Sequence, residues 1–227
     1  KRQGVMAKYV FEGIARVPVE VDLASEYRYR DPIFDRNTLV IIVSQSGETA
    51  DSLAALRESK ANGQRVLGIV NVVGSSIARE ADNVMYTWAG PEISVATTKA
   101  YSAQLASFYL LAMKFGKVRK ALADSDYEQM IGDLQQLPGM MEELLKDRQQ
   151  IQRFANRYLA AEHIFFIGRG IDYAISMEGS LKLKEISYIH SEAYAAGELK
   201  HGTISLIEEG TLVVALATQE ALSLIHI

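Results

Sequence analysis

The feature that most constrains the fold is a continuous apolar run, Thr38 to Val43 (TLVIIV), which leads into a polar loop and then a helical pattern. Such runs are typical of strands that are buried on both faces of a parallel sheet. A helix is predicted over residues 50–61, and Asn62-Gly63 supplies the residues that commonly end a helix. Strand, loop and helix in this order predict one unit of a parallel α/β sheet.

The same alternation continues along the chain and predicts an α/β fold, with parallel sheets flanked by helices and right-handed crossovers. The further strands are expected over residues 65–70, 84–88, 163–167 and 211–217, and the further helices over 5–15, 75–81, 97–115 and from Met177. Residues 124–161 carry no strand signal and are predicted to form two or three helices, broken at Leu137-Pro138-Gly139. A short strand is predicted over Pro18–Val21, and the single tryptophan, Trp88, is expected in the core.

The order of these patterns divides the chain. We expect a first lobe over residues 1–122, without its first strand, a helical connector over 123–161 and the start of a second lobe over 162–221. The last six residues, 222–227 (LSLIHI), match no turn or cap pattern. A common sequencing adaptor encodes the same hexapeptide when it is translated in frame, so we expect residues 222–227 to be a non-native tail.

Composition excludes several classes of function. A net charge of −4 argues against nucleic acid or an anionic membrane as the main partner, and no apolar run has transmembrane length. The absence of cysteine excludes disulfides and thiol catalysis within this sequence. No His/Asp/Glu cluster has metal-binding spacing and no glycine-rich dinucleotide signature is present, so we expect neither a metal nor a cofactor. A cytoplasmic location is expected.

A polar loop follows the first strand, where a helix begins, and its candidate ligand-binding residues are Ser44, Gln45, Ser46 and Thr49. Free N–H groups and the dipole at a helix start favour an anion, and Gly47 allows close approach to the backbone. No lysine follows, so the loop differs from the nucleotide-binding GxxxxGK[ST] loop. These neutral donors suit a phosphomonoester that must leave again, as on a sugar phosphate. The alternative is that Ser46 or Thr49 only caps the helix.

A second polar loop, Gly90–Lys99, follows the third strand and delivers more hydroxyl groups to a helix start. The two loops are expected at the carboxyl edge of the sheet, where open α/β folds bind ligands. Taken alone, the second loop is a weaker signal of the same site.

The helical pattern from Met177 carries three charges in an unusual place: Glu178, Lys182 and Glu185. On a helical wheel they lie within the apolar arc of Leu181, Ile186, Tyr188 and Ile189, whereas Ser180, Lys184 and Ser187 lie opposite. Charges on a core-facing arc are costly unless they are paired or line a wet cleft. We therefore expect the three charges to project into a cleft at the ligand edge of the second lobe, with a structural ion network as the alternative.

These residue types allow sugar chemistry. A carboxylate beside a lysine can move a proton between neighbouring carbons of a sugar. The glycine-bounded loop that follows contains His201, whose imidazole is a residue type suited to proton transfer and could open a sugar ring. His163 and His190 are expected to be packed or hydrogen-bonded instead of belonging to the site.

The motifs together resemble the sugar isomerase (SIS) family, and within it the isomerase half of the glucosamine-6-phosphate synthases, which are glutamine–fructose-6-phosphate aminotransferases. The similar stretches, within about Gly4–Glu220, are SQSGETADSLAALR, ASEYRYR, TTKAYSAQL, FIGRG and EGSLKLKEISYIHSEAYAAGELKHG. SQSGET is typical of sugar-phosphate SIS domains in general, whereas the last stretch is specific. The resemblance implies an SIS-type fold and an enzyme that makes glucosamine 6-phosphate from fructose 6-phosphate and glutamine.

Carried over by position, the resemblance implies a role for each candidate residue. The phosphate is held by Ser44, Gln45, Ser46 and Thr49. Val95 and Thr97 lie against the sugar, although the family often has serine at the position of Thr97. Glu185 moves the proton between C1 and C2, with Lys182 beside it and Glu178 in support. His201 opens the sugar ring in the site of the partner subunit, which implies a homodimer.

The resemblance also implies that parts of such an enzyme lie outside this sequence: a glutaminase domain in the same full-length chain, the first strand with its phosphate loop, and a C-terminal Schiff-base lysine. The chain alone is therefore expected to be inactive. One alternative is a fructosamine-6-phosphate deglycase-type SIS enzyme. Another is a non-catalytic SIS domain that senses a sugar phosphate, which would have no need of Glu185 and His201.

Overall fold

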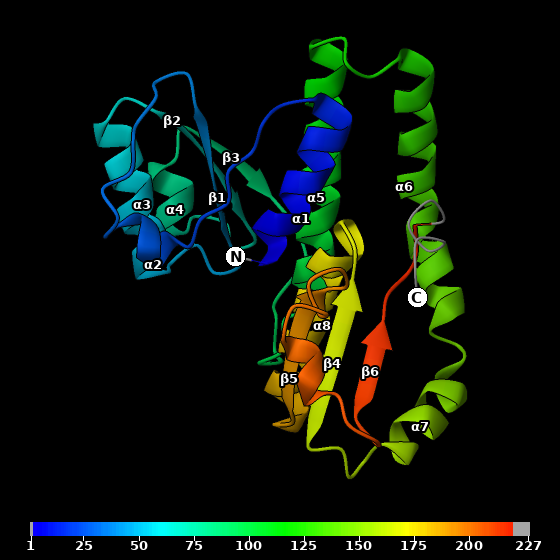
Figure 1. Cartoon of the computed structure of the whole chain (residues 1–227). Coiled ribbons are helices and arrows are strands. Elements are labelled where there is room, and N and C mark those ends of the chain that lie inside the picture. The colour runs from blue at the N-terminus through cyan, green and yellow to red at the C-terminus, as the bar shows by residue number, and fades with distance from the viewer. Residues whose placement is uncertain (1, 220–227) are drawn as a thin grey trace. The chain divides into compact units, whose positions relative to one another are not determined.

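The computed structural model describes residues 2–219, which form two compact units, one over Gln3–Arg119 and one from Lys120 onward (Figure 1). Each unit contains a three-stranded parallel sheet with helices packed against it. The predicted α/β class is therefore confirmed. The expected non-native tail, residues 222–227, lies outside the described residues.

The first unit is built on strands β1 (Leu39–Ser44), β2 (Arg65–Val70) and β3 (Asn83–Tyr86), in that order across the sheet. Helix α3 (Ala50–Ala61) joins β1 to β2, and α4 (Ser76–Glu80) joins β2 to β3. These bounds match the predicted elements to within two residues. The core between sheet and helices is apolar, because Leu56, Val66 and Ile77 are fully buried.

Helices outside the sheet complete this unit: α1 (Arg2–Val10), the π-helical turn η1 (Phe11–Ala15), α2 (Ala24–Tyr27) and α5 (Lys99–Val118). The η1 turn packs on α5, where the rings of Phe11 and Phe115 meet edge to face at 5.6 Å. The α2 turn packs on α3, and the hydroxyl groups of Tyr27 and Ser59 lie 3.1 Å apart. These contacts hold η1 and α2 against the two longer helices of the unit.

The second unit begins with helices α6 (Asp124–Leu144) and α7 (Arg148–Arg157). Its sheet has β4 (His163–Gly168) in the centre, between β5 (His190–Ala195) and β6 (Leu212–Ala215). Helix α8 (Ile171–Ser187) packs on β4 and β5 (Figure 1). A 3-10 turn, η2 (Thr203–Leu206), follows β5 in the chain and precedes β6. Within residues 2–219, no helix is long and apolar enough to cross a membrane.

Two predicted helix boundaries are wrong. Helix α6 continues through Pro138, and α5 continues through Gly116 to Val118. A proline removes one backbone hydrogen bond and Gly139 is a poor helix former, but strong helix formers (Gln, Leu, Met and Glu) lie on both sides of this pair. The chain instead leaves the helix at residues 145–147, before Asp147 accepts a hydrogen bond from the Gln150 N–H and caps α7.

Strand predictions failed at two places. Pro18–Val21 is not a strand, whereas β5 was missed because the sequence HSEAYA is rich in alanine, glutamate and serine. The predicted helix from Met177 ends at Ser187, and Tyr188 adopts a left-handed conformation (φ 61°) that turns the chain toward β5. Trp88, expected in the core, is 75% exposed just after β3. Residues 190–195 form a strand because they pair with β4, and not because of their own strand propensity.

Candidate functional site

The carboxyl ends of the three strands of the first unit meet at one edge of the sheet. Ser44, the last residue of β1, pairs with Val70 of β2, and Val70 pairs with Tyr86 of β3. The loops that follow, residues 45–49, 71–75 and 87–98, therefore leave the same edge. The two polar loops that the sequence marked come together in this way.

The loop after β1 is folded tightly around Ser44. The Gly47 N–H donates to Ser44 Oγ at 3.0 Å, and the Thr49 hydroxyl lies 3.4 Å from the same oxygen. Gly47 has a φ of 69°, and a Cβ there would lie 2.1 Å from Ser75 Oγ. Only glycine fits this position, because both the left-handed backbone and the close approach of Ser75 exclude a side chain.

Thr49 occupies the N-cap position of α3, yet its side chain makes no capping hydrogen bond. The Thr49 hydroxyl therefore does not cap the helix. Thr49 is exposed, so its hydroxyl is available to a ligand at the helix start. Ser46 is exposed as well, and its Oγ accepts a hydrogen bond at 3.2 Å from the Glu48 N–H within the same loop.

Gln45 and Asn71 join the three loops. The Asn71 N–H donates to the Gln45 carbonyl at 3.2 Å. The Asn71 side chain donates to the Gly90 carbonyl at 2.8 Å, and its Oδ1 accepts from the Ala89 N–H and the Thr87 hydroxyl. Sequence reasoning missed Asn71, although its place directly after β2 was a signal. The buried side-chain oxygen of Gln45 has no hydrogen-bond partner within the described residues.

Glu48 ties the loop after β1 to the start of α4. Its Oε1 accepts from the Ser76 N–H at 2.8 Å, and hydrogen bonds from Ser76 hold the pKa of Glu48 below its usual value. The Ile77 N–H also donates to the Gly47 carbonyl at 3.0 Å. Both hydrogen bonds come from the start of α4, so this helix supports the loop after β1.

In the loop after β3, the two residues that the family resemblance assigns to sugar contact differ in exposure. Val95 is 90% exposed, and Thr97 is half-buried just before α5. Lys99 donates to the Pro91 carbonyl at 2.6 Å and closes the loop on itself. Val95 and Thr97 thus lie in the loop that leaves this edge after β3.

In the second unit, α8 brings the three predicted charges together. Lys182 Nζ lies 2.5 Å from Glu185 Oε2 and 3.5 Å from Glu178 Oε1. Side-chain exposure rises along the trio, from 8% for Glu178 through 19% for Lys182 to 27% for Glu185. Glu178 Oε2 is buried without a hydrogen-bond partner among the described residues. Glu185 is therefore the carboxylate most open to a substrate, and Glu178 is the inner partner of the lysine.

The expectation that these three charges lie at the ligand edge of the second sheet is wrong. Helix α8 runs from the carboxyl end of β4 back to the amino end of β5, so Glu185 lies just before the amino end of β5. His201 follows the carboxyl end of β5, with about 20 Å of strand between them. His201 is exposed, and its N–H donates to the Glu198 carbonyl within a turn.

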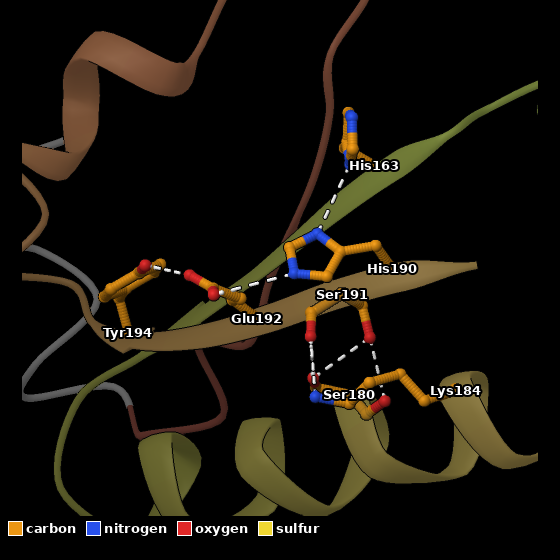
Figure 2. Close-up of polar contacts among 7 residues, drawn as sticks. All are labelled: His163, Ser180, Lys184, His190, Ser191, Glu192 and Tyr194. Carbon is orange, nitrogen blue, oxygen red and sulfur yellow. Dashed lines mark hydrogen bonds and ion pairs between the residues drawn. The ribbon is translucent and has the colours of Figure 1, made fainter. Parts of the chain in front are cut away.

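Two buried serines hold α8 against β5 (Figure 2). Ser180 Oγ lies 3.0 Å from Ser191 Oγ, and Ser191 Oγ donates to the Ser180 carbonyl at 2.8 Å. Lys184 donates to the Ser191 carbonyl at 2.8 Å. Ser180 was expected on the polar side of the helix but is 1% exposed. The hydroxyl pair satisfies polar groups in the interface, so the serines fix the position of the helix that carries the trio.

Comparison with known proteins matches the SIS domain family to residues 3–114 and 158–226. Among curated proteins, this chain is similar to two glutamine–fructose-6-phosphate aminotransferases (isomerizing). It is 60% identical to that of Clostridium acetobutylicum over 95% of this chain, and 58% identical to that of Caldanaerobacter subterraneus subsp. tengcongensis over 96% of this chain. The chain spans 36% of the length of each of these two relatives.

Two solved structures share the fold. The C-terminal domain of glucosamine-fructose-6-phosphate aminotransferase from Francisella tularensis is 41% identical, with a TM-score of 0.94 over 97% of this chain and 63% of that one. The glucosamine-6-phosphate deaminase from Thermotoga maritima is 25% identical, with a TM-score of 0.77 over 94% of this chain and 63% of that one.

Proposed function

The chain belongs to the SIS domain family, and from this membership we propose that it is the isomerase part of a glutamine–fructose-6-phosphate aminotransferase. Relatives of that name are 58–60% identical over nearly the whole chain, which supports the proposal. The observation that carries it is the trio Glu178, Lys182 and Glu185, ion-paired on one helix. A domain that only binds a sugar phosphate needs no such base.

In the first unit, Ser44, Gln45, Ser46 and Thr49 bind the phosphate of fructose 6-phosphate and of the product, glucosamine 6-phosphate. The uncapped start of α3, with the exposed hydroxyls of Ser46 and Thr49, offers the phosphate donors from several directions. Neutral donors release a product phosphate more readily than a lysine would. Val95 and Thr97 line the sugar side of the same edge.

In the second unit, Glu185 acts as the base. It removes a proton from C1 of the open-chain sugar and returns the proton to C2, which converts the ketose arrangement into the aldose arrangement. Lys182, 2.5 Å away, keeps a positive charge beside the carboxylate, and Glu178 holds the lysine from the buried side. His201 opens the sugar ring by moving the proton of the anomeric hydroxyl to the ring oxygen, as the bond between that oxygen and the anomeric carbon breaks.

The family resemblance implies a homodimer in which His201 serves the site of the partner subunit. The separation of Glu185 and His201 at the two ends of β5 agrees with this arrangement. This chain spans only 36% of the length of these relatives, which supports the presence of a further domain in the full-length protein. We propose that this domain is a glutaminase, which releases ammonia from glutamine. We place the enzyme in the cytoplasm.

A matched pair of substitutions in the full-length protein tests the proposal. Glu185→Gln keeps the shape of the side chain but removes the base, so isomerisation should fall by about 10²–10⁴-fold. Fructose 6-phosphate affinity and glutamine hydrolysis should stay unchanged. Glu178→Gln is the control and should cost visibly less. If Glu185→Gln isomerises near the wild-type rate, the trio is a structural ion network and the assignment is wrong.

The same assays separate the alternatives. A fructosamine-6-phosphate deglycase-type enzyme would release free sugar phosphate from a fructosamine 6-phosphate and make no glucosamine 6-phosphate from glutamine. A sensor would bind the sugar phosphate and turn over neither substrate. Either result with the full-length protein would replace the proposal.

A further inference from the structure

The face of the second sheet opposite α8 carries a row of polar side chains. The parallel register pairs His163 of β4 with His190 of β5, and side chains alternate along a strand, so Glu192 and Tyr194 share the face of His190. Ser191, between them, contacts α8 on the other face (Figure 2). The row therefore lies away from the helix with the proposed catalytic trio.

The row is a connected chain of contacts (Figure 2). The Nδ1 atoms of His163 and His190 lie 3.3 Å apart, and His190 Nε2 lies 3.6 Å from Glu192 Oε1. The Tyr194 hydroxyl donates to the other oxygen of Glu192. The Tyr194 ring stacks on buried Phe165 at 6.1 Å, which anchors the outer end of the chain.

These contacts select the tautomer of His190. The hydrogen bond to Glu192, followed by burial, raises the pKa of Tyr194, so the phenol stays protonated and donates to the carboxylate. The free Glu192 oxygen then favours a proton on His190 Nε2. The Nδ1 lone pair of His190 is left pointing toward His163, and a carboxylate behind a ligand histidine is the usual way to orient it for a metal.

The distance between the two imidazoles fits an ion. Zinc–nitrogen bonds of about 2.0–2.1 Å place two ligands of a tetrahedral ion about 3.3–3.4 Å apart. The Nδ1 atoms of His163 and His190 already have this separation, on adjacent strands in fixed register. Both histidines are exposed, with 56% of the His190 side chain open to solvent, so an ion and its waters can reach them.

We propose that His163 and His190 bind a borderline divalent cation of the Zn²⁺ class through their Nδ1 atoms, oriented by Glu192 and Tyr194. When the ion binds, the proton between the two nitrogens, which His163 Nδ1 carries, moves through solvent to Nε2 of the same ring, so that both Nδ1 lone pairs face the ion. Within residues 2–219, no group of three or more His, Cys, Asp or Glu side chains could hold a metal, so water supplies the remaining ligands. The ion would clamp β4 to β5 and takes no part in the sugar chemistry.

The test uses untagged full-length protein that has been treated with chelator and dialysed. Titration with ZnCl₂ by calorimetry should show one equivalent per chain that is lost in both His163→Ala and His190→Ala. Saturating Zn²⁺ should raise the Tm of the wild type and leave the Tm of both variants unchanged, because an ion stabilises only the state that binds it. Glu192→Gln keeps both imidazoles and should weaken the affinity about 10–100-fold.

His201→Ala removes one imidazole elsewhere in this unit and is the matched control, with zinc binding expected to be unchanged. Copper(II) in place of zinc should show nitrogen ligands by electron paramagnetic resonance, and the signal should change in either histidine variant. The proposal is overturned if the wild type binds no Zn²⁺. It also fails if His163→Ala or His190→Ala binds Zn²⁺ like the wild type, or if Glu192→Gln leaves the affinity unchanged.

Discussion

The two units differ in the kind of polar side chain that they bury. In the first unit the buried polar side chains are neutral, such as Ser52, Ser59 and Gln104, and further hydroxyl and amide groups gather in the loops at one edge of the sheet. In the second unit two carboxylates, Asp172 and Glu178, are buried on α8, together with Ser176, Ser180 and Ser191. Loop donors at an edge can hold and release an anion, whereas buried polar groups fix the position of a helix that carries charges.

Asp172 tests this contrast most strongly. It accepts hydrogen bonds from the N–H and hydroxyl of Thr218, at 2.9 Å and 2.5 Å. Two bonds to a charged acceptor are worth about 1.5–3 kcal/mol each, so Asp172→Ala should lower the free energy of unfolding by at least about 3 kcal/mol. Urea unfolding of the full-length protein measures this. A loss below about 1 kcal/mol would mean that the buried polar groups do not hold this unit together.

The pH dependence of the same residue sharpens the test. Burial would raise the pKa of Asp172, but the hydrogen bonds from Thr218 and Gln219 outweigh it and lower the pKa. A carboxylate with a lowered pKa stabilises the fold above its unfolded pKa of about 3.9 and loses that contribution as the pH falls through the folded value. The stability gap between the wild type and Asp172→Asn should therefore be full near pH 6 and shrink below about pH 4. A gap that widens on acidification would contradict this sign.

The edge of the first unit should show the opposite behaviour, a loss of affinity without a loss of stability. Ser46→Ala and Thr49→Ala each remove one hydroxyl donor to a charged ligand, worth about 1.5–3 kcal/mol. Fructose 6-phosphate should bind the full-length variants correspondingly more weakly, with unfolding curves close to the wild type. Glu26→Ala, an exposed change on α2, is a control for both readouts. Wild-type affinity in both hydroxyl variants would remove the phosphate assignment.

Asn71 should give the smallest and most selective effect. Its side chain positions the loop after β3 through three hydrogen bonds, each worth about 1 kcal/mol. Asn71→Ala should raise the KM for fructose 6-phosphate more than it lowers kcat, because the loops that hold the substrate drift while the proposed base on α8 is untouched. Asn71→Asp keeps the acceptor for Ala89 and Thr87 and should recover part of the loss. An effect on kcat alone would show that Asn71 does not act through substrate positioning.

Sequence reasoning worked where local pattern and tertiary packing agree. The apolar run of β2 is buried on both faces, and those of β1 and β4 are buried or half-buried after their first residue, so their composition alone marks them. The spacing of Glu178, Lys182 and Glu185 places them on one helix face whatever surrounds the helix. Pattern reasoning also located the polar loop after β1, because a strand followed by a helix leaves free backbone donors at the helix start.

Only the tertiary structure decided the features that depend on pairing between distant residues. Strand β5 exists because β4 offers it a partner, since its own residues favour other structures. The direction of α8 follows from that strand and separates Glu185 from His201. Asn71 reaches three loops only because β1, β2 and β3 end together, and His163 meets His190 across 27 residues through strand register. Local composition carries no information on such contacts, because their free energy arises between segments that the sequence keeps apart.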